Sequence, residues 1–154
     1  MSALNKIIDL NGKWQGTKHL WLSPEAPARN SQSTAKIHST AQGQFTEIRY
    51  TWADEGKPQE GRLILGLDTQ QKVVKAVWFD TWHLSEQFMV CEGRVDDHGG
   101  VNIQGTYAAP GGPDWGWQIR IEPKDQDQFA LRMYNIAPQG EKMLAVEINY
   151  SRKG

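Results

Sequence analysis

The sequence predicts an all-β protein: a single antiparallel up-and-down β-barrel of about ten strands, formed by residues 1–154, with minimal helix. Two observations favour this fold. Apolar and polar side chains alternate with a period of two from Trp14 to the C-terminus, as in half-buried strands. Turn residues interrupt this alternation every eight to twelve positions, and connections that short join antiparallel neighbours.

The clearest alternation places Ile48, Tyr50 and Trp52 on one face of a strand, opposite polar neighbours. Turn chemistry such as the Gly and Pro residues of 55–58 and 109–113 separates the strands. Only the segment before Gly12 has helical spacing, enough for one short turn. The predicted strands are 13–22, 32–40, 44–53, 60–67, 73–80, 86–95, 100–108, 115–122, 127–134 and 143–152. A barrel of nearly ten strands leaves room for a ligand inside.

Composition narrows the classes of function. A formal net charge of −1 gives no basic excess for a nucleic acid, so no nucleic-acid partner is expected. The sequence contains no apolar run long enough to span a membrane, and no membrane partner is expected. Cys91 is the single cysteine and cannot form an internal disulfide, which favours a cytoplasmic protein. No cofactor is expected.

Both ends of the sequence carry a familiar pattern. Gly12-Lys13-Trp14-Gln15-Gly16 enters the first strand, and Tyr150-Ser151-Arg152 lies in the last. Together they resemble the signature of the calycins, which include lipocalins and fatty-acid-binding proteins. The segments 80–83, 114–117 and 134–136 resemble those of an uncharacterised, mostly bacterial calycin-like family. The resemblance implies that Arg152 lies across Trp14 and closes the barrel, with Trp14 as a structural plug.

The chain departs from two calycin groups. Its loop at 23–30 is too short and too rich in proline to form the two-helix lid of fatty-acid-binding proteins. Haem-binding barrels with the same N-terminal pattern need a late histidine as iron ligand, and no histidine follows His98.

Aromatic side chains provide the main candidates for a ligand site. Tryptophans suit the wall of a pocket for an apolar or planar ligand, although a small barrel also fills its interior with such side chains. Trp78, Asp80 and Trp82 alternate, so an extended strand would point all three inward. The predicted ligand-binding residues are Tyr50, Trp52, Trp78, Asp80, Trp82, His83, Trp115, Trp117, Arg120, Tyr134 and Glu147.

Four polar residues, Asp80, Arg120, Arg132 and Glu147, have two interpretations each. Asp80 could orient His83 as a general base, or its carboxylate could cap the backbone of a turn. A buried Asp80 would need a donor, for which His83, Arg120 or a ligand amine are available. Arg120, Arg132 and Glu147 face solvent if apolar residues fill the barrel, but an anionic ligand could draw them inward. The four histidines lie on different segments, and no metal site is predicted.

These observations support a barrel that binds a small hydrophobic or amphipathic ligand, with no catalytic residue assigned. Two alternatives remain at this point. The same pocket could belong to an enzyme that uses His83 with Asp80 or Glu147 in acid–base chemistry. The barrel could instead have a filled interior and bind another protein through an exposed apolar patch.

Overall fold

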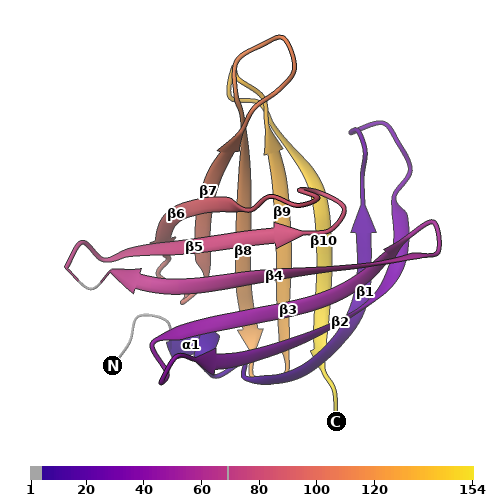
Figure 1. Ribbon diagram of the computed structural model, residues 1–154. Coiled ribbons are helices and arrows are strands. Elements are labelled where there is room, and N and C mark those ends of the chain that lie inside the picture. The colour runs from indigo at the N-terminus through magenta and orange to yellow at the C-terminus, as the bar shows by residue number, and fades with distance from the viewer. Residues whose placement is uncertain (1–4, 69) are drawn as a thin grey trace.

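The structure, a computed structural model, describes residues 5–68 and 70–154 as one closed antiparallel barrel (Figure 1). Each strand pairs with its neighbours in the sequence, and the first strand pairs with the last. This arrangement confirms the predicted up-and-down barrel of ten strands. The described residues contain one helix of four residues, and none of their helices is long and apolar enough to cross a membrane.

The elements, in chain order, are α1 (Asn5–Ile8), β1 (Gly12–Leu20), β2 (Arg29–Thr40), β3 (Phe45–Asp54), β4 (Lys57–Asp68), β5 (Val73–Asp80), β6 (Met89–Val95), β7 (Val101–Tyr107), β8 (Trp115–Asp125), β9 (Gln128–Ile136) and β10 (Lys142–Arg152). Two of these strands, β4 and β6, begin at other residues than predicted, for a structural reason. β4 begins earlier because Glu55 and Gly56, both with positive φ, make a tight turn directly after β3. β6 begins later because residues 81–88 form a loop.

The up-and-down topology gives the barrel two different ends. At one end, here called the floor, α1 and the segment after it cover the interior with the buried side chains of Ile7 and Leu10. At the other end, the mouth, lie the loops 21–28, 81–88 and 108–114. In Figure 1, α1 and the C-terminus both lie at the lower end of the barrel, the floor, where β1 begins and β10 ends.

Closure at the floor depends on Trp14 and Arg152, which are paired across β1 and β10. The guanidinium carbon of Arg152 lies 4.4 Å from the centroid of the Trp14 ring. The indole N–H of Trp14 donates to the Leu10 carbonyl at 2.8 Å, and Phe129 packs edge-on against the ring at 4.8 Å. Arg152 also donates to the carbonyl of Asn11 at 2.7 Å. One arginine therefore joins the first strand, the last strand and the segment that covers the floor.

The two glycines of the N-terminal motif are required by close approaches. A Cβ on Gly12 would lie 2.7 Å from Nη1 of Arg152, and the Gly12 φ of +136° also disfavours a side chain. A Cβ on Gly16 would lie 2.4 Å from the backbone oxygen of Asn149 on β10. The glycines thus let the guanidinium and the last strand come close to β1.

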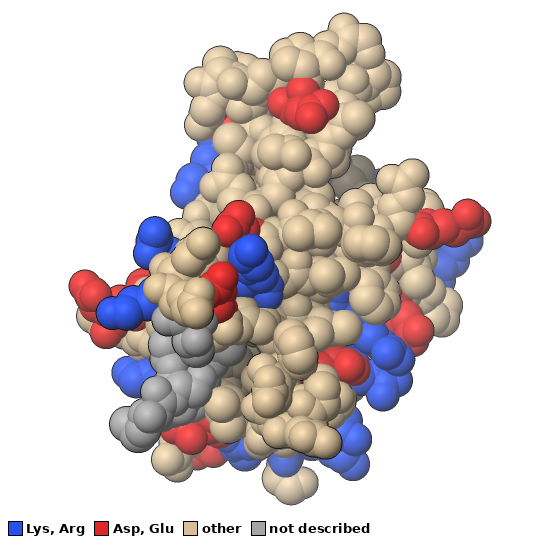
Figure 2. All heavy atoms as spheres, turned by 60° about the vertical axis from the view of Figure 1, so that its left-hand side comes forward, with Lys and Arg blue, Asp and Glu red and all other residues tan. Residues whose placement is uncertain are grey.

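Charged side chains of both signs are scattered over the face in Figure 2, and the upper lobe of that view is almost free of them. This distribution agrees with the formal net charge of −1.

Replacing Arg152 with alanine should lower the stability of the barrel by about 2 kcal/mol, because the cation–π contact and the packing on Trp14 are lost. For a chain of this size the melting temperature should fall by roughly 4–8 °C. Arg152→Lys should recover only part of the loss, because an ammonium lacks the planar surface that stacks on indole. Thermal denaturation followed by circular dichroism measures both. Arg94→Ala, at an exposed arginine of β6, is the control; a wild-type melting curve for Arg152→Ala would contradict the closure role.

Candidate functional site

Asp80, the last residue of β5, is the buried charge around which the mouth of the barrel is organised; it is 1 % exposed. Its Oδ2 accepts from the hydroxyl of Tyr50 at 2.7 Å and from the indole N–H of Trp52 at 3.1 Å. Its Oδ1 accepts from the backbone N–H groups of Trp82 and His83 at 2.9 and 3.0 Å. Four donors thus satisfy a carboxylate that would otherwise be costly to bury.

Tyr50 extends this network across the interior. Its hydroxyl accepts from the indole N–H of Trp78 at 2.9 Å while donating to Asp80. Burial, together with the negative charge of Asp80, raises the pKa of Tyr50 well above its ordinary value. The tyrosine ring lies directly over Gly61 of β4, where a Cβ would come within 2.3 Å of its hydroxyl oxygen. Gly61, which was not among the predicted site residues, therefore makes room for the central member of the network.

The loop 81–88 closes over the mouth because Asp80 ends its strand. The two backbone bonds to Oδ1, and a bond from the Leu84 N–H to the Asp80 carbonyl at 3.0 Å, turn the chain immediately after Asp80. The strand does not stay extended, so Trp82 does not continue the alternation as expected. The turn instead carries His83 back toward the barrel axis.

His83 packs among four tryptophans. Its ring centroid lies 4.7 Å from that of Trp82, 5.3 Å from Trp117, 5.6 Å from Trp78 and 5.8 Å from Trp52. Trp78 and Trp117 are stacked nearly parallel at 5.4 Å. Burial, and secondarily the charge of Lys18, lowers the pKa of His83 to about 4. The imidazole is therefore neutral near pH 7.

A cavity of about 160 Å³ remains beside this cluster, and Tyr107, Leu84 and Met89 complete its wall with Trp78, His83 and Trp117. Two buried nitrogens of this wall, Nε2 of His83 and Nε1 of Trp117, have no hydrogen-bond partner. The indole nitrogen is a fixed donor, whereas a neutral imidazole nitrogen donates or accepts according to its tautomer. A single small polar group in the cavity could bond both.

Lys18 is a second buried charge, which the sequence-based choice of site residues missed. It is 1 % exposed, and its Nζ lies 3.1 Å from the centroid of the Trp52 ring. Burial lowers its pKa to about 7, against the opposing attraction of Asp80 and Asp54. A signal for it existed, because Lys18 shares the inward phase of Trp14 and Leu20 on β1.

Three of the predicted ligand-binding residues lie outside the barrel. Arg120, Tyr134 and Glu147 alternate with buried apolar residues on β8, β9 and β10, and so project from the outer face. There Arg132 bonds Glu147 at 2.8 Å and also pairs with Glu122, which in turn lies 3.2 Å from Arg120. With apolar side chains filling the interior, these charges remain in contact with water. They form an ion-pair network on the wall and not part of the interior site.

The remaining predicted residues meet at or near the mouth. Trp115 pairs with Tyr107 across β7 and β8 and is partly exposed at the rim. Trp82 packs edge-on against Trp52 at 5.7 Å, and its indole N–H donates to Asp54 at 3.2 Å. Tyr50, Trp52, Trp78, Asp80, Trp82, His83 and Trp117 thus form one connected cluster.

This geometry limits the chemistry of the two polar residues. Asp80 bonds the backbone N–H of His83 and uses its other oxygen on Tyr50 and Trp52, so it does not orient the imidazole. Asp80 therefore has the turn-capping role. Among the described residues, no three His, Cys, Asp or Glu side chains are grouped so that they could hold a metal ion.

Comparison with known proteins places this barrel in a family. The crystal structure of Rv2717c from M. tuberculosis superimposes with a TM-score of 0.64 at 15 % identity, covering 100 % of this chain and 99 % of that one. A redesigned β-barrel gives a TM-score of 0.47 at 14 % identity, covering 99 % of this chain and 96 % of the design. A de novo designed fluorescence-activating β-barrel gives 0.45 at 13 % identity, covering 93 % of each chain.

The likeness to Rv2717c concerns the fold alone. No curated protein matches the sequence significantly. A family model described as "Protein of unknown function (DUF1579)" matches residues 5–152, which is nearly the whole chain. The chain therefore belongs to the DUF1579 family of proteins of unknown function.

Proposed function

We propose that this barrel binds a small, uncharged, aromatic or amphipathic molecule in the cavity beneath the loop 81–88. The observation that carries the proposal is the pair of unpartnered nitrogens, Nε2 of His83 and Nε1 of Trp117, on the wall of the 160 Å³ cavity. Each buried nitrogen left without a partner costs about 1–3 kcal/mol. A ligand with one polar atom on an apolar body would satisfy both and fill the space.

The size and charge of the site define the class of ligand. A cavity of about this volume holds roughly one aromatic ring. The cavity wall supplies no free counter-charge: His83 is its one titratable group near neutral pH and is uncharged there, Lys18 is not part of the wall, and four donors already occupy the nearby Asp80. A phenol fits this description, because its hydroxyl can accept from Trp117 and donate to His83 while its ring lies beside Trp78.

The proposal also includes that the barrel is a calycin. It rests on the Gly-x-Trp entry to β1 and on the arginine of β10 that stacks on that tryptophan. In this proposal the protein is a cytoplasmic carrier or sensor of its ligand, and the loop 81–88 opens to admit it.

Phenol should bind to the wild-type protein and quench or shift its tryptophan fluorescence, because the cavity wall contains Trp78 and Trp117. Trp117→Phe keeps an aromatic wall but removes the N–H donor, and should weaken phenol binding about tenfold, the value of one hydrogen bond. Trp115→Phe, at the rim, is the matched control and should bind like the wild type. Calorimetric titration measures the affinities.

Benzene tests the polar half of the same site. Because benzene makes no hydrogen bond, it should bind to the wild type more weakly than phenol does. Its affinity for Trp117→Phe should equal its affinity for the wild type. If phenol does not bind at all, or binds Trp117→Phe as tightly as the wild type, then solvent satisfies the two nitrogens and the proposal fails.

The neutrality of His83 predicts a pH dependence of stability. Its pKa is about 4 in the folded protein and 6.5 when unperturbed, so the unfolded chain binds the proton more readily between these values. Stability should therefore fall as the pH drops from 6.5 toward 4, by up to about 1.4 kcal/mol per pH unit from this group. Urea denaturation should show a shallower fall for His83→Gln than for the wild type. His98→Gln, in an exposed turn, should keep the wild-type slope.

Lys18 should also make the stability of the protein depend on pH: stability again rises with pH, but in a higher pH range than for His83. Its pKa is about 7 when folded and 10.5 when unperturbed, so the unfolded chain holds the extra proton between these values. Stability should rise as the pH increases from 7 to 9, and Lys18→Met should abolish this rise. At pH 7 and below, Lys18→Met should be at least as stable as the wild type, because a buried charge is removed. An unchanged slope in Lys18→Met would show that the amine is solvated.

A further inference from the structure

Four cationic side chains lie in one row across the outer face of β1 to β4. Lys13 is directly opposite Lys36, Lys36 is opposite Arg49, and Arg49 is opposite Arg62. Each of them alternates with buried residues of its strand, so all four project from the wall. The side chains of Arg49 and Arg62 are 51 % and 40 % exposed, and Lys13 and Lys36 are exposed.

Such a row destabilises the barrel unless an anion meets it, because like charges directly opposite one another on neighbouring strands repel. Glu47 offsets part of the repulsion: its Oε1 lies 3.7 Å from Nε of Arg49 and 3.9 Å from Nη1 of Arg62. In the part of the chain that the structure describes, no carboxylate forms an ion pair with Lys13 or Lys36. The repulsion is therefore greatest at the β1–β2 end of the row.

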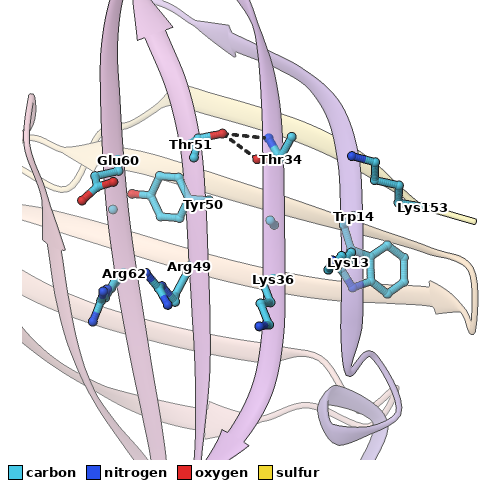
Figure 3. A pocket seen from close by; sticks show the side chains of 12 residues that line it. Lys13, Trp14, Thr34, Lys36, Arg49, Tyr50, Thr51, Glu60, Arg62 and Lys153 are labelled. Atoms are coloured by element: carbon cyan, nitrogen blue, oxygen red, sulfur yellow. Dashed lines mark hydrogen bonds between the residues drawn. The ribbon is translucent and has the colours of Figure 1, made fainter.

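The row borders a hollow of about 380 Å³ on the outer wall (Figure 3). Lys153 adds a fifth cation, and its backbone N–H donates to the Lys13 carbonyl at 2.8 Å, which holds the C-terminal segment beside the row. Thr34 and Thr51 line the hollow along with Glu60. Five cations face two carboxylates, Glu47 and Glu60, so the site has a formal excess of three positive charges.

The shape of this charge selects the ligand. Neighbouring strands are about 4.8 Å apart, so the four cations extend over roughly 15 Å and are one residue wide. Glu47 and Glu60 lie on the two sides of the row and would repel a broad polyanion, whereas a narrow linear one avoids them. Arginine forks bind phosphate oxygens in pairs, and lysines add point charges.

We propose that the outer face of β1–β4 is a binding site for a small ligand that carries a linear chain of phosphate groups. The site is separate from the interior cavity, because that cavity is lined by residues of β5–β8 and of the loop 81–88. A single phosphate would meet one or two of the cations, while a linear chain of phosphates meets more of them as it lengthens.

Calorimetric titration with inorganic tripolyphosphate at low salt tests the proposal. The wild type should bind it, with an affinity that falls as salt is added. Lys36→Gln/Arg49→Gln, which removes the middle of the row, should bind at least about tenfold more weakly. Lys75→Gln/Arg94→Gln removes two exposed cations from β5 and β6 and should stay within about twofold of the wild type. Equal losses in both double variants, or no binding by the wild type, would overturn the site.

Two further ligands test the shape of the anion. Cyclic tetrametaphosphate is compact and highly charged and should bind more weakly than the linear chain; equal affinity would overturn the linear geometry. An oligothymidylate of ten nucleotides should bind no better than tripolyphosphate. If the oligonucleotide binds and tripolyphosphate does not, the surface is a nucleic-acid site instead. Phenol binding in the interior should be unchanged in Lys36→Gln/Arg49→Gln, so the two proposals fail or succeed separately.

The stability of the free protein provides a second readout. Lys36→Gln should melt at the same or a higher temperature than the wild type without ligand, because a repulsion is relieved. Tripolyphosphate should raise the melting temperature of the wild type and not that of the Lys36→Gln/Arg49→Gln variant. A lower melting temperature for Lys36→Gln would show that the row is structural.

Discussion

The buried carboxylate of Asp80 is the constraint on which the mouth of the barrel depends. One oxygen holds Tyr50 and Trp52, and through Tyr50 it fixes the indole of Trp78. The other oxygen stops β5 and directs the loop 81–88 across the opening. The four hydrogen bonds that allow the carboxylate to be buried therefore also fix the orientation of the interior aromatic side chains and the position of the loop 81–88 over the mouth. An apolar residue at this position would leave the Tyr50 hydroxyl and two backbone N–H groups without an acceptor.

Of the two roles that the sequence left open for Asp80, the structure has the turn cap and not the orientation of His83. The carboxylate faces inward, as its phase with Trp78 predicts, and it also caps a turn. The expected donors were His83, Arg120 or a ligand amine, whereas the actual ones are Tyr50, Trp52 and the backbone. Periodicity predicts which face a residue occupies, but it does not predict which neighbours from other strands reach it, because that depends on register.

The fold was predictable because alternation and turn chemistry are local properties, and nearly every strand of the barrel has both. The site was predictable in part. Tyr50, Trp52, Trp78 and Trp117 meet in the interior. Arg120, Tyr134 and Glu147 lie on the outer face of the barrel, as expected when apolar side chains fill the interior. Lys18 shows the converse error: its inward phase was visible, yet a lysine between apolar residues is easily assigned to the surface. The turn after Asp80 is made by local hydrogen bonds, which the turn-capping interpretation anticipated. The packing of His83 against Trp78 and Trp117 was not predictable, because it depends on how distant strands are arranged.

The pairing of β1 with β10 has a consequence for how the chain folds. The bond between Arg152 and the Asn11 carbonyl joins positions 141 residues apart, so the barrel closes only when the two ends of the sheet meet. Every other strand pair forms between sequence neighbours and can zip up locally. Until the final pair forms, β1 and β10 are open edges whose backbone groups can pair with another molecule. Closure of so long a loop is slow relative to hairpin formation. A refolding chain therefore spends its longest interval as an open sheet with two unpaired edge strands. During that interval, pairing of an edge strand with another molecule competes with the pairing of β1 and β10.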